Sequence, residues 1–195
     1  MKNVILSFIC LLMLGFSTNN SGFKTAEFLI EGNSELGIAG STNVNEFNCN
    51  LLFSDINSKV KALYQKEGNK IKFQDASLHL ANECFDCGSR MMNNDFLEML
   101  KTQRYPNIAL DLKEIIINPK NPNENIALLN ISLAGRSKLY SIWLNVNQSD
   151  KINASGCLKL NLSDFNLEPP KKMLGLVVVD DAIEINLDLK IKPIK

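Results

Sequence analysis

The sequence predicts an all-β protein, built as a closed antiparallel barrel of about eight strands with one short helix. Three observations lead to this fold class. Apolar and polar residues alternate with a period of two along most of the chain, polar turn sequences separate the alternating runs, and a helical period occurs once after the N-terminal region. A barrel is favoured over an open sheet because closure leaves no unpaired edge, and about eight strands can enclose side chains or one small ligand.

The predicted helix lies ahead of Pro106. Its apolar residues recur at three- and four-residue spacing and share one face: Met92, Phe96, Met99 and Leu100. Asn94 or Asp95 is expected to cap the first turn, and the helix must end before Tyr105, since proline restricts the residue before it to an extended backbone. One short amphipathic helix is too small to cover a sheet face. It can, however, close one end of a barrel near its mouth.

Strand alternation is clearest in the second half of the chain, where short polar turns join three successive strands into a predicted meander. Residues 41–45 interrupt an earlier alternation and are expected to form a bulge or a sheet corner, and residues 55–69 are polar, with one weak strand. The residues predicted to face one side are Ile108, Leu110, Leu112, Ile131, Leu133, Tyr140, Ile142, Leu144, Leu187 and Leu189. They either fill a solid core or line a ligand cavity, and alternation alone does not distinguish the two.

Length and charge narrow the functional classes. A chain of 195 residues is expected to form one domain, and its 21 basic and 21 acidic residues cancel. No basic stripe is present, so nucleic-acid binding is not expected. The lysines near the end, Lys190, Lys192 and Lys195, are too few to predict a role at a membrane surface.

The N-terminal segment predicts export. Lys2 precedes an apolar run from Val4 to Phe16, and the small residues Gly15 and Ser17 suit a cleavage site. The run is too short to span a bilayer comfortably. We therefore expect residues 1–20 to be a secretory signal peptide and residues 21–195 to be a periplasmic or secreted domain.

Four cysteines remain in the exported part, and four cysteines allow three disulfide pairings. A disulfide between Cys49 and Cys87 is preferred, because a bridge that closes a long loop constrains the unfolded chain more than one that closes four residues. Cys84 and Cys157 then pair or stay reduced. Two alternatives remain: Cys84 and Cys87 as a redox pair, and a metal site that includes Cys49 and His79.

Catalytic chemistry has little support in the sequence. His79 is the single histidine, and no serine or carboxylate stands at a telling distance from it. Asp180 and Asp181 suit a turn between strands and are too few for a calcium site. No catalytic residue, metal ligand set or cofactor is predicted.

Several stretches resemble the YceI-like family of exported lipocalin-like proteins. These are GSTNVNEF at 40–47, SRMMNNDF at 89–96, YPNI at 105–108, the strand pair around Gly135, and GCLKLNLSDF at 156–165. Together they cover nearly the whole chain after the leader. The resemblance implies an eight-stranded lipocalin-like barrel whose interior holds a polyisoprenoid chain, with a helix near the mouth.

The same resemblance turns the inward-facing residues named above, with Phe96 and Leu100 of the helix, into predicted ligand contacts. It implies an isoprenoid lipid or a quinone as partner, transient contact with a membrane, and no enzymatic activity. The chain departs from the common family pattern where Met91 follows Arg90 and where Ser137 follows Gly135 and Arg136. A cysteine-based redox factor and an envelope-stress protein without a ligand are the alternatives.

Overall fold

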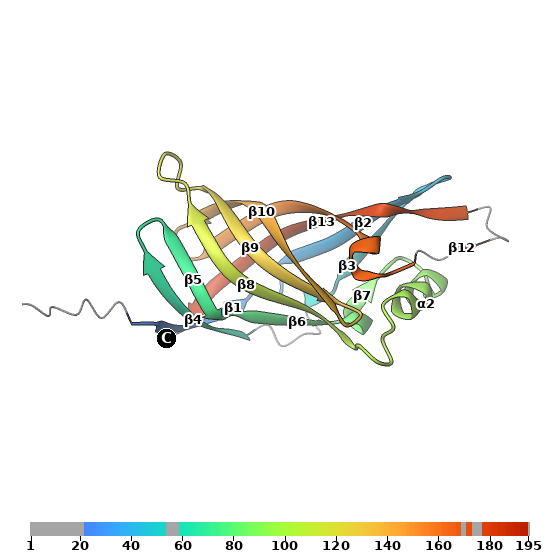
Figure 1. Cartoon of the computed structure of the whole chain (residues 1–195), viewed down its shortest axis with the longest axis horizontal. Helices are drawn as coiled ribbons and strands as arrows, with labels where there is room; N and C mark the ends of the chain where they lie inside the picture. Colours follow the sequence, from blue (N-terminus) through green and yellow to red (C-terminus); the bar gives the residue numbers. More distant parts are fainter. Residues whose placement is uncertain (1–21, 54–58, 169–170, 173–176, 195) are drawn as a thin grey trace, which may run out of the picture.

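The computed structural model describes residues 22–53, 59–168, 171–172 and 177–194, so the predicted leader lies outside the described residues. The described chain is mostly antiparallel strands, with one α-helix, α2 (Arg90–Met99), at one end (Figure 1). The strands are β1 (Lys24–Ile30), β2 (Glu35–Thr42), β3 (Glu46–Leu51), β4 (Lys59–Glu67), β5 (Lys70–Asp75), β6 (Ser77–Ala81), β7 (Phe85–Asp86), β8 (Asn107–Ile117), β9 (Glu124–Leu133), β10 (Arg136–Gln148), β11 (Ile152–Asn161), β12 (Lys171–Lys172) and β13 (Val177–Ile194). The described chain also contains the two 3-10 turns η3 (Asn82–Cys84) and η4 (Leu162–Phe165).

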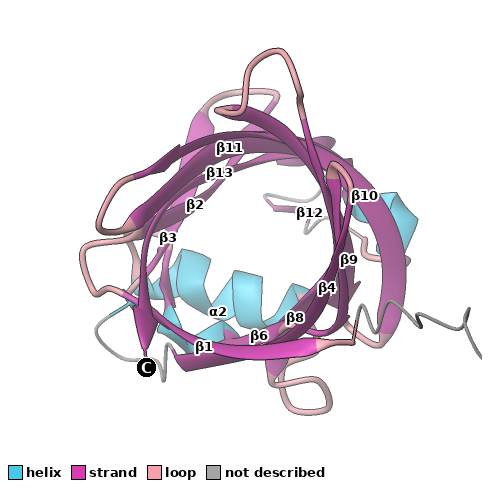
Figure 2. Cartoon of the chain, turned by 90° about the vertical axis from the view of Figure 1, so that its left-hand side faces the viewer, coloured by secondary structure: helices cyan, strands magenta, loops and turns pink. Residues whose placement is uncertain are grey.

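Eight of these strands close into a ring, in the order β1, β4, β5, β8, β9, β10, β11 and β13. The ring closes where β1 pairs with the C-terminal part of β13, from Glu27 opposite Ile194 to Ile30 opposite Ile191. Figure 2 looks into this ring, with α2 across one end. The prediction of an eight-stranded antiparallel barrel is therefore confirmed.

The end of the ring that carries α2 is built differently. There β13 pairs with β2 instead of β1, and β8 pairs with β6 instead of β5. The sheet continues from β2 through β3 to β7, and within the described chain no strand pairing joins β7 to β6. The η3 turn connects these two strands, and the Leu52 amide donates a hydrogen bond to the Cys84 carbonyl at 2.9 Å. At this end β6 and β7 are therefore joined through η3 and not through strand pairing, and α2 lies beside them (Figure 1).

The interruption at residues 41–45 is a tight hairpin turn between β2 and β3, so the expectation of a bulge or sheet corner is wrong. Thr42 explains the turn, because its hydroxyl oxygen accepts from the amides of Val44 and Asn45 at 3.1 and 2.9 Å. The hydroxyl thus supplies the hydrogen-bond acceptor that these two backbone amides do not find on a neighbouring strand.

The helix begins one turn earlier than predicted. Ser89 is its N-cap, with an extended backbone and a side-chain oxygen that accepts from the Met92 amide at 3.3 Å. Asn94 and Asp95 lie inside the helix, so the expectation that either caps it is wrong. The predicted apolar face is confirmed, since Phe96 and Leu100 are buried and Met92 and Met99 pack against the core.

Two contacts hold the loop after α2 against the barrel. Gly135 has a φ of +80°, and a Cβ atom there would lie 2.5 Å from Cζ of Tyr105, so the ring occupies the space that a side chain would need. The buried Asn82 side chain donates to the Thr102 hydroxyl and to the Tyr105 carbonyl, both at 2.9 Å. The position of α2 is therefore fixed at its C-terminal end.

Candidate ligand-binding cavity

A cavity of about 480 Å³ lies inside the barrel at the end that carries α2. It is enclosed by α2, the β2–β3 hairpin and strands β6, β8, β9 and β13. Its size falls in the range of about 300–1,000 Å³ that is usual for small-molecule sites. The residues that line it are Leu36, Ile38, Thr42, Val44, Asn45, Phe47, Cys49, Leu80, Phe85, Cys87, Met91, Met92, Asp95, Phe96, Met99, Leu100, Ile108, Leu110, Ile131, Leu133, Leu162, Val177, Val179, Ile183 and Ile185.

Six of the twelve predicted contact residues line this cavity: Phe96, Leu100, Ile108, Leu110, Ile131 and Leu133. The other six lie elsewhere in the barrel: Leu112, Tyr140, Ile142, Leu144, Leu187 and Leu189. Ile142 is buried in the core, and the remaining five are half-buried and pack against it. All twelve predicted contact residues thus face inward. The six that line the cavity lie at the end of the barrel that carries α2, and the other six lie farther from α2.

Sequence reasoning missed the contributions of the hairpin and of β13. Phe47 on β3 lines the cavity and lies over Gly40, its partner on β2, where a side chain would collide with the Phe47 ring. Ile183 and Ile185 on β13 line it as well. These residues alternate with polar ones in the sequence, but alternation carries no information on which end of a long strand meets the helix. Met92 and Met99 of α2 were predicted to lie on its apolar face but not to contact a ligand, and Met91 was not predicted to do either.

Among the described lining residues, three have polar side chains: Thr42, Asn45 and Asp95. Asn45 accepts a hydrogen bond from the Thr42 hydroxyl through Oδ1 at 2.7 Å. Its side-chain amide nitrogen makes no hydrogen bond with another residue in the described ranges. Asp95 lies on α2, directly before the buried Phe96. An apolar chain can therefore occupy the cavity while a polar end group is held by these three side chains.

Two lining residues are also strongly exposed to solvent. Val44 in the β2–β3 turn is 67% exposed, and Met91 in the first turn of α2 is 66% exposed. Val178 at the start of β13, next to the lining residues Val177 and Val179, is 41% exposed. The cavity thus opens to the outside between the hairpin and the helix, and its rim is apolar.

A disulfide between Cys49 and Cys87 forms part of the cavity wall, which confirms the preferred pairing. Beside it the Cys87 amide donates to Oδ1 of Asn93 on α2 at 2.7 Å. Cys84 takes no part in this bond, so Cys84 and Cys87 do not form a Cys-x-x-Cys disulfide. The bond also occupies the sulfur that the metal alternative requires from Cys49, and the described ranges contain no cluster of three or more metal-binding side chains.

Tyr140 contacts η4, the 3-10 turn beside the cavity. Its hydroxyl donates to Oδ2 of Asp164 at 2.7 Å, and its ring stacks on Phe165 with centroids 6.1 Å apart. Burial and this hydrogen bond raise the pKa of the Tyr140 hydroxyl. Hydrogen bonds from Lys138 and Tyr140 lower the pKa of Asp164. The cluster fixes η4, whose first residue, Leu162, is a lining residue.

An antiparallel barrel that encloses an apolar cavity beside a short helix has a lipocalin-like fold. Within the described ranges, no helix has both the length and the apolar character needed to cross a membrane. No protein-family model matches the sequence, and no curated protein matches it either.

Solved structures share this fold. BcnA of Burkholderia cenocepacia is 17% identical with a TM-score of 0.57, over 81% of this chain and 95% of that one. A polyisoprenoid-binding domain from Saccharophagus degradans is 14% identical with a TM-score of 0.62, over 87% and 99%. The YceI protein of Campylobacter jejuni is 16% identical with a TM-score of 0.53, over 69% and 80%. The chain therefore has the YceI-like fold.

Proposed function

We propose that this protein is an exported binding protein that holds the apolar chain of an isoprenoid lipid in the cavity beside α2. The observation that carries the proposal is the distribution of polarity: the part of the lining that the structure describes is apolar except for Thr42, Asn45 and Asp95. The fold shared with a polyisoprenoid-binding domain supports the class of ligand. No side-chain arrangement in the described chain calls for catalysis, and we propose a non-enzymatic role.

A polar head group fits this arrangement. Asn45 can donate a hydrogen bond to the carbonyl oxygen of a quinone, and Asp95 can accept one from the hydroxyl of a polyprenol. The apolar tail would then lie between α2 and strands β8 and β9, in contact with Phe96, Leu110 and Ile131. A polyisoprenoid and an isoprenoid quinone are therefore both suitable ligands, and they differ in the group that meets the polar side chains.

The exposed rim suits transfer of a lipid from a membrane. Val44 and Met91 expose apolar surface beside the opening, and burial of that surface in a bilayer releases free energy of about 25 cal/mol per Å². We propose that contact with the membrane is transient. The disulfide suits an oxidising compartment, and it supports export to the periplasm or the exterior by the leader predicted over residues 1–20.

The test is solvent extraction and mass spectrometry of the exported protein, purified from bacteria without detergent. We expect an isoprenoid in a ratio near one to one. The matched variants are Leu110→Trp and Leu112→Trp, two inward residues on β8 of which only Leu110 lines the cavity. Leu110→Trp should lose the lipid and Leu112→Trp should keep it, with thermal unfolding as the control for folding. An empty wild-type protein that also refuses added quinones and polyprenols would overturn the proposal.

A further inference from the structure

A second hollow, of about 980 Å³, lies over the side of the sheet that carries the exposed Trp143, and the inward-facing Leu36, Leu51, Leu144 and Leu187 of the same strands also contribute to its lining. It extends over β10, β11, β13, β2 and β3, which are consecutive strands of the sheet. One row of directly paired residues crosses it: Trp143, Cys157, Asn186, Gly37 and Asn50. Paired residues point to the same side of a sheet, so the row forms a continuous track of four strand spacings, roughly 19 Å. We call this hollow the outer groove.

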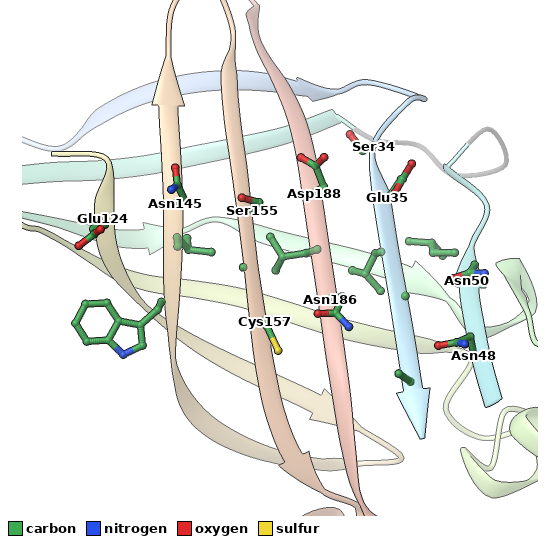
Figure 3. A pocket seen from close by; sticks show the side chains of 18 residues that line it. Ser34, Glu35, Asn48, Asn50, Glu124, Asn145, Ser155, Cys157, Asn186 and Asp188 are labelled. Atoms are coloured by element: carbon green, nitrogen blue, oxygen red, sulfur yellow. The ribbon is translucent and has the colours of Figure 1, made fainter. Parts of the chain in front are cut away.

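A second row runs parallel to the first, through Asn145, Ser155, Asp188 and Glu35. Figure 3 shows these four labelled side chains on successive strands, with Asn48 and Asn50 on the last strand. Gly37 keeps the groove floor low, since a Cβ atom there would lie 3.0 Å from Oδ1 of Asn50. The groove is therefore long and shallow, with polar side chains along it.

Trp143 stands at one end of the first row and is 65% exposed. It is the single tryptophan of the sequence. An indole ring placed in water loses the packing that would normally bury it, so such exposure marks a contact surface. The flat ring offers a stacking platform beside the polar rows.

The polar side chains of the groove are available to a ligand. The side chains of Asn48, Asn50, Asn145, Ser155 and Glu35 make no hydrogen bond or ion pair with another residue in the described ranges. Among the described residues, the lining includes the carboxylates Glu35, Glu124 and Asp188 but no lysine or arginine. Lys190, beyond the lining, pairs with Asp188 at 2.6 Å. Amides and carboxylates without a cation can bind hydroxyl groups, and they repel an anionic polymer or an anionic lipid surface.

We propose that the outer groove binds a neutral, extended carbohydrate chain. A sugar ring has an apolar C–H face that can stack on the indole of Trp143, and its hydroxyl groups can both donate to and accept from amide side chains. If a protein partner with few polar groups docked here instead, it would bury these amides without hydrogen-bond partners, and that burial costs free energy. The proposal does not depend on the lipid, because this groove is on the outside of the sheet.

The single tryptophan makes a direct test available. The fluorescence of the wild-type protein reports Trp143 alone, and it is measured during titration with cellohexaose, mannohexaose and xylohexaose. Hexagalacturonate is the anionic comparison. We expect a saturable blue shift at millimolar concentration with at least one neutral oligosaccharide and none with hexagalacturonate. No shift with any neutral oligosaccharide, or stronger binding of hexagalacturonate, would overturn the proposal.

Variants then locate the site by saturation-transfer NMR, which does not need tryptophan. Trp143→Ala should weaken binding at least about tenfold, which corresponds to about 1.4 kcal/mol. Leu139→Ala is the matched control, because Leu139 lies on the same face of β10, is 56% exposed and does not line the groove. Equal binding by Trp143→Ala and the wild type would show that the sugar binds elsewhere. A blue shift with protein concentration alone, together with a dimer in sedimentation, would identify the groove as a self-association surface and reject the proposal.

Discussion

Cys49 and Cys87 join β3 to the segment that leads into α2, and both residues of this disulfide are buried in the wall of the cavity. The bond therefore connects the hairpin side of the opening to the helix side. The hydrogen bond from the Cys87 amide to Asn93 extends the connection into α2 itself. Changes at this bond should affect both the stability of the protein and its hold on a ligand.

Removal of the disulfide should destabilise the protein. The two cysteines are 38 residues apart, and the loop-entropy relation gives roughly 4 kcal/mol for a loop of that size. The double variant Cys49→Ala, Cys87→Ala should lower the free energy of unfolding in urea by up to that amount and should bind lipid more weakly. Cys157→Ala, at an exposed position outside the disulfide, is the control and should change it by less than about 0.5 kcal/mol. Equal midpoints for the double variant and the wild type would contradict the prediction.

Asn82→Ala should also destabilise the fold. Asn82 is 1% exposed, and its side-chain amide supplies hydrogen bonds to Thr102 and to the Tyr105 carbonyl. Loss of this donor removes the hydrogen bond to the partly buried Tyr105 carbonyl, at a cost of about 1–3 kcal/mol. Asn48→Ala is a suitable comparison because Asn48 is exposed and makes no side-chain hydrogen bond within the described ranges. Urea unfolding of the two variants measures the difference, and similar midpoints would show that Asn82 is not needed to hold the loop.

Tyr140 should make stability decrease at alkaline pH. Its pKa is raised in the folded protein, so the folded state retains the phenolic proton that the unfolded chain loses at the ordinary pKa of about 10. The contribution is complete below that pH and is lost as the pH rises toward the folded pKa. Urea midpoints between pH 8 and pH 11 should fall more steeply for the wild type than for Tyr140→Phe. Parallel curves would remove Tyr140 as the cause.

The apolar rim should control the rate of lipid transfer. The double variant Val44→Ser, Met91→Ser removes exposed apolar surface beside the opening without adding charge. We expect transfer of a fluorescent quinone analogue from phosphatidylcholine vesicles to slow by about fivefold, because less apolar area can enter the bilayer during the encounter. Leu139→Ser removes an exposed leucine elsewhere and should transfer at the wild-type rate. Equal rates for all three proteins would argue against a membrane encounter at the rim.

The helix shows how far local sequence information extends. The three- and four-residue period correctly identified the face that carries Phe96 and Leu100, because a helix fixes which side chains share a side. The cap was misplaced because Asn94, Asp95 and Ser89 are all suitable capping residues by type. Only Ser89 has the extended backbone that the position requires.

A strand was underestimated for a related reason. The segment of β4 has exposed lysines on its outer face, which gave residues 55–69 a polar character, whereas Ala62 on its inner face is buried. Pairing of β4 with both β1 and β5 stabilises it as a full strand of nine residues. Neighbouring strands supply these hydrogen bonds, and a local pattern does not contain them.

The sequence by itself determined the period of each segment, and with it the barrel class, the apolar face of the helix and the inward orientation of Leu110 and Leu112. The tertiary structure alone decided that Leu110 meets the cavity and Leu112 does not, since this depends on where α2 packs along the barrel. It also decided which residues meet on the outside. Trp143 and Asn50 are far apart in the chain. They share one groove only because the strand register aligns β10, which carries Trp143, with β11, β13, β2 and finally β3, which carries Asn50.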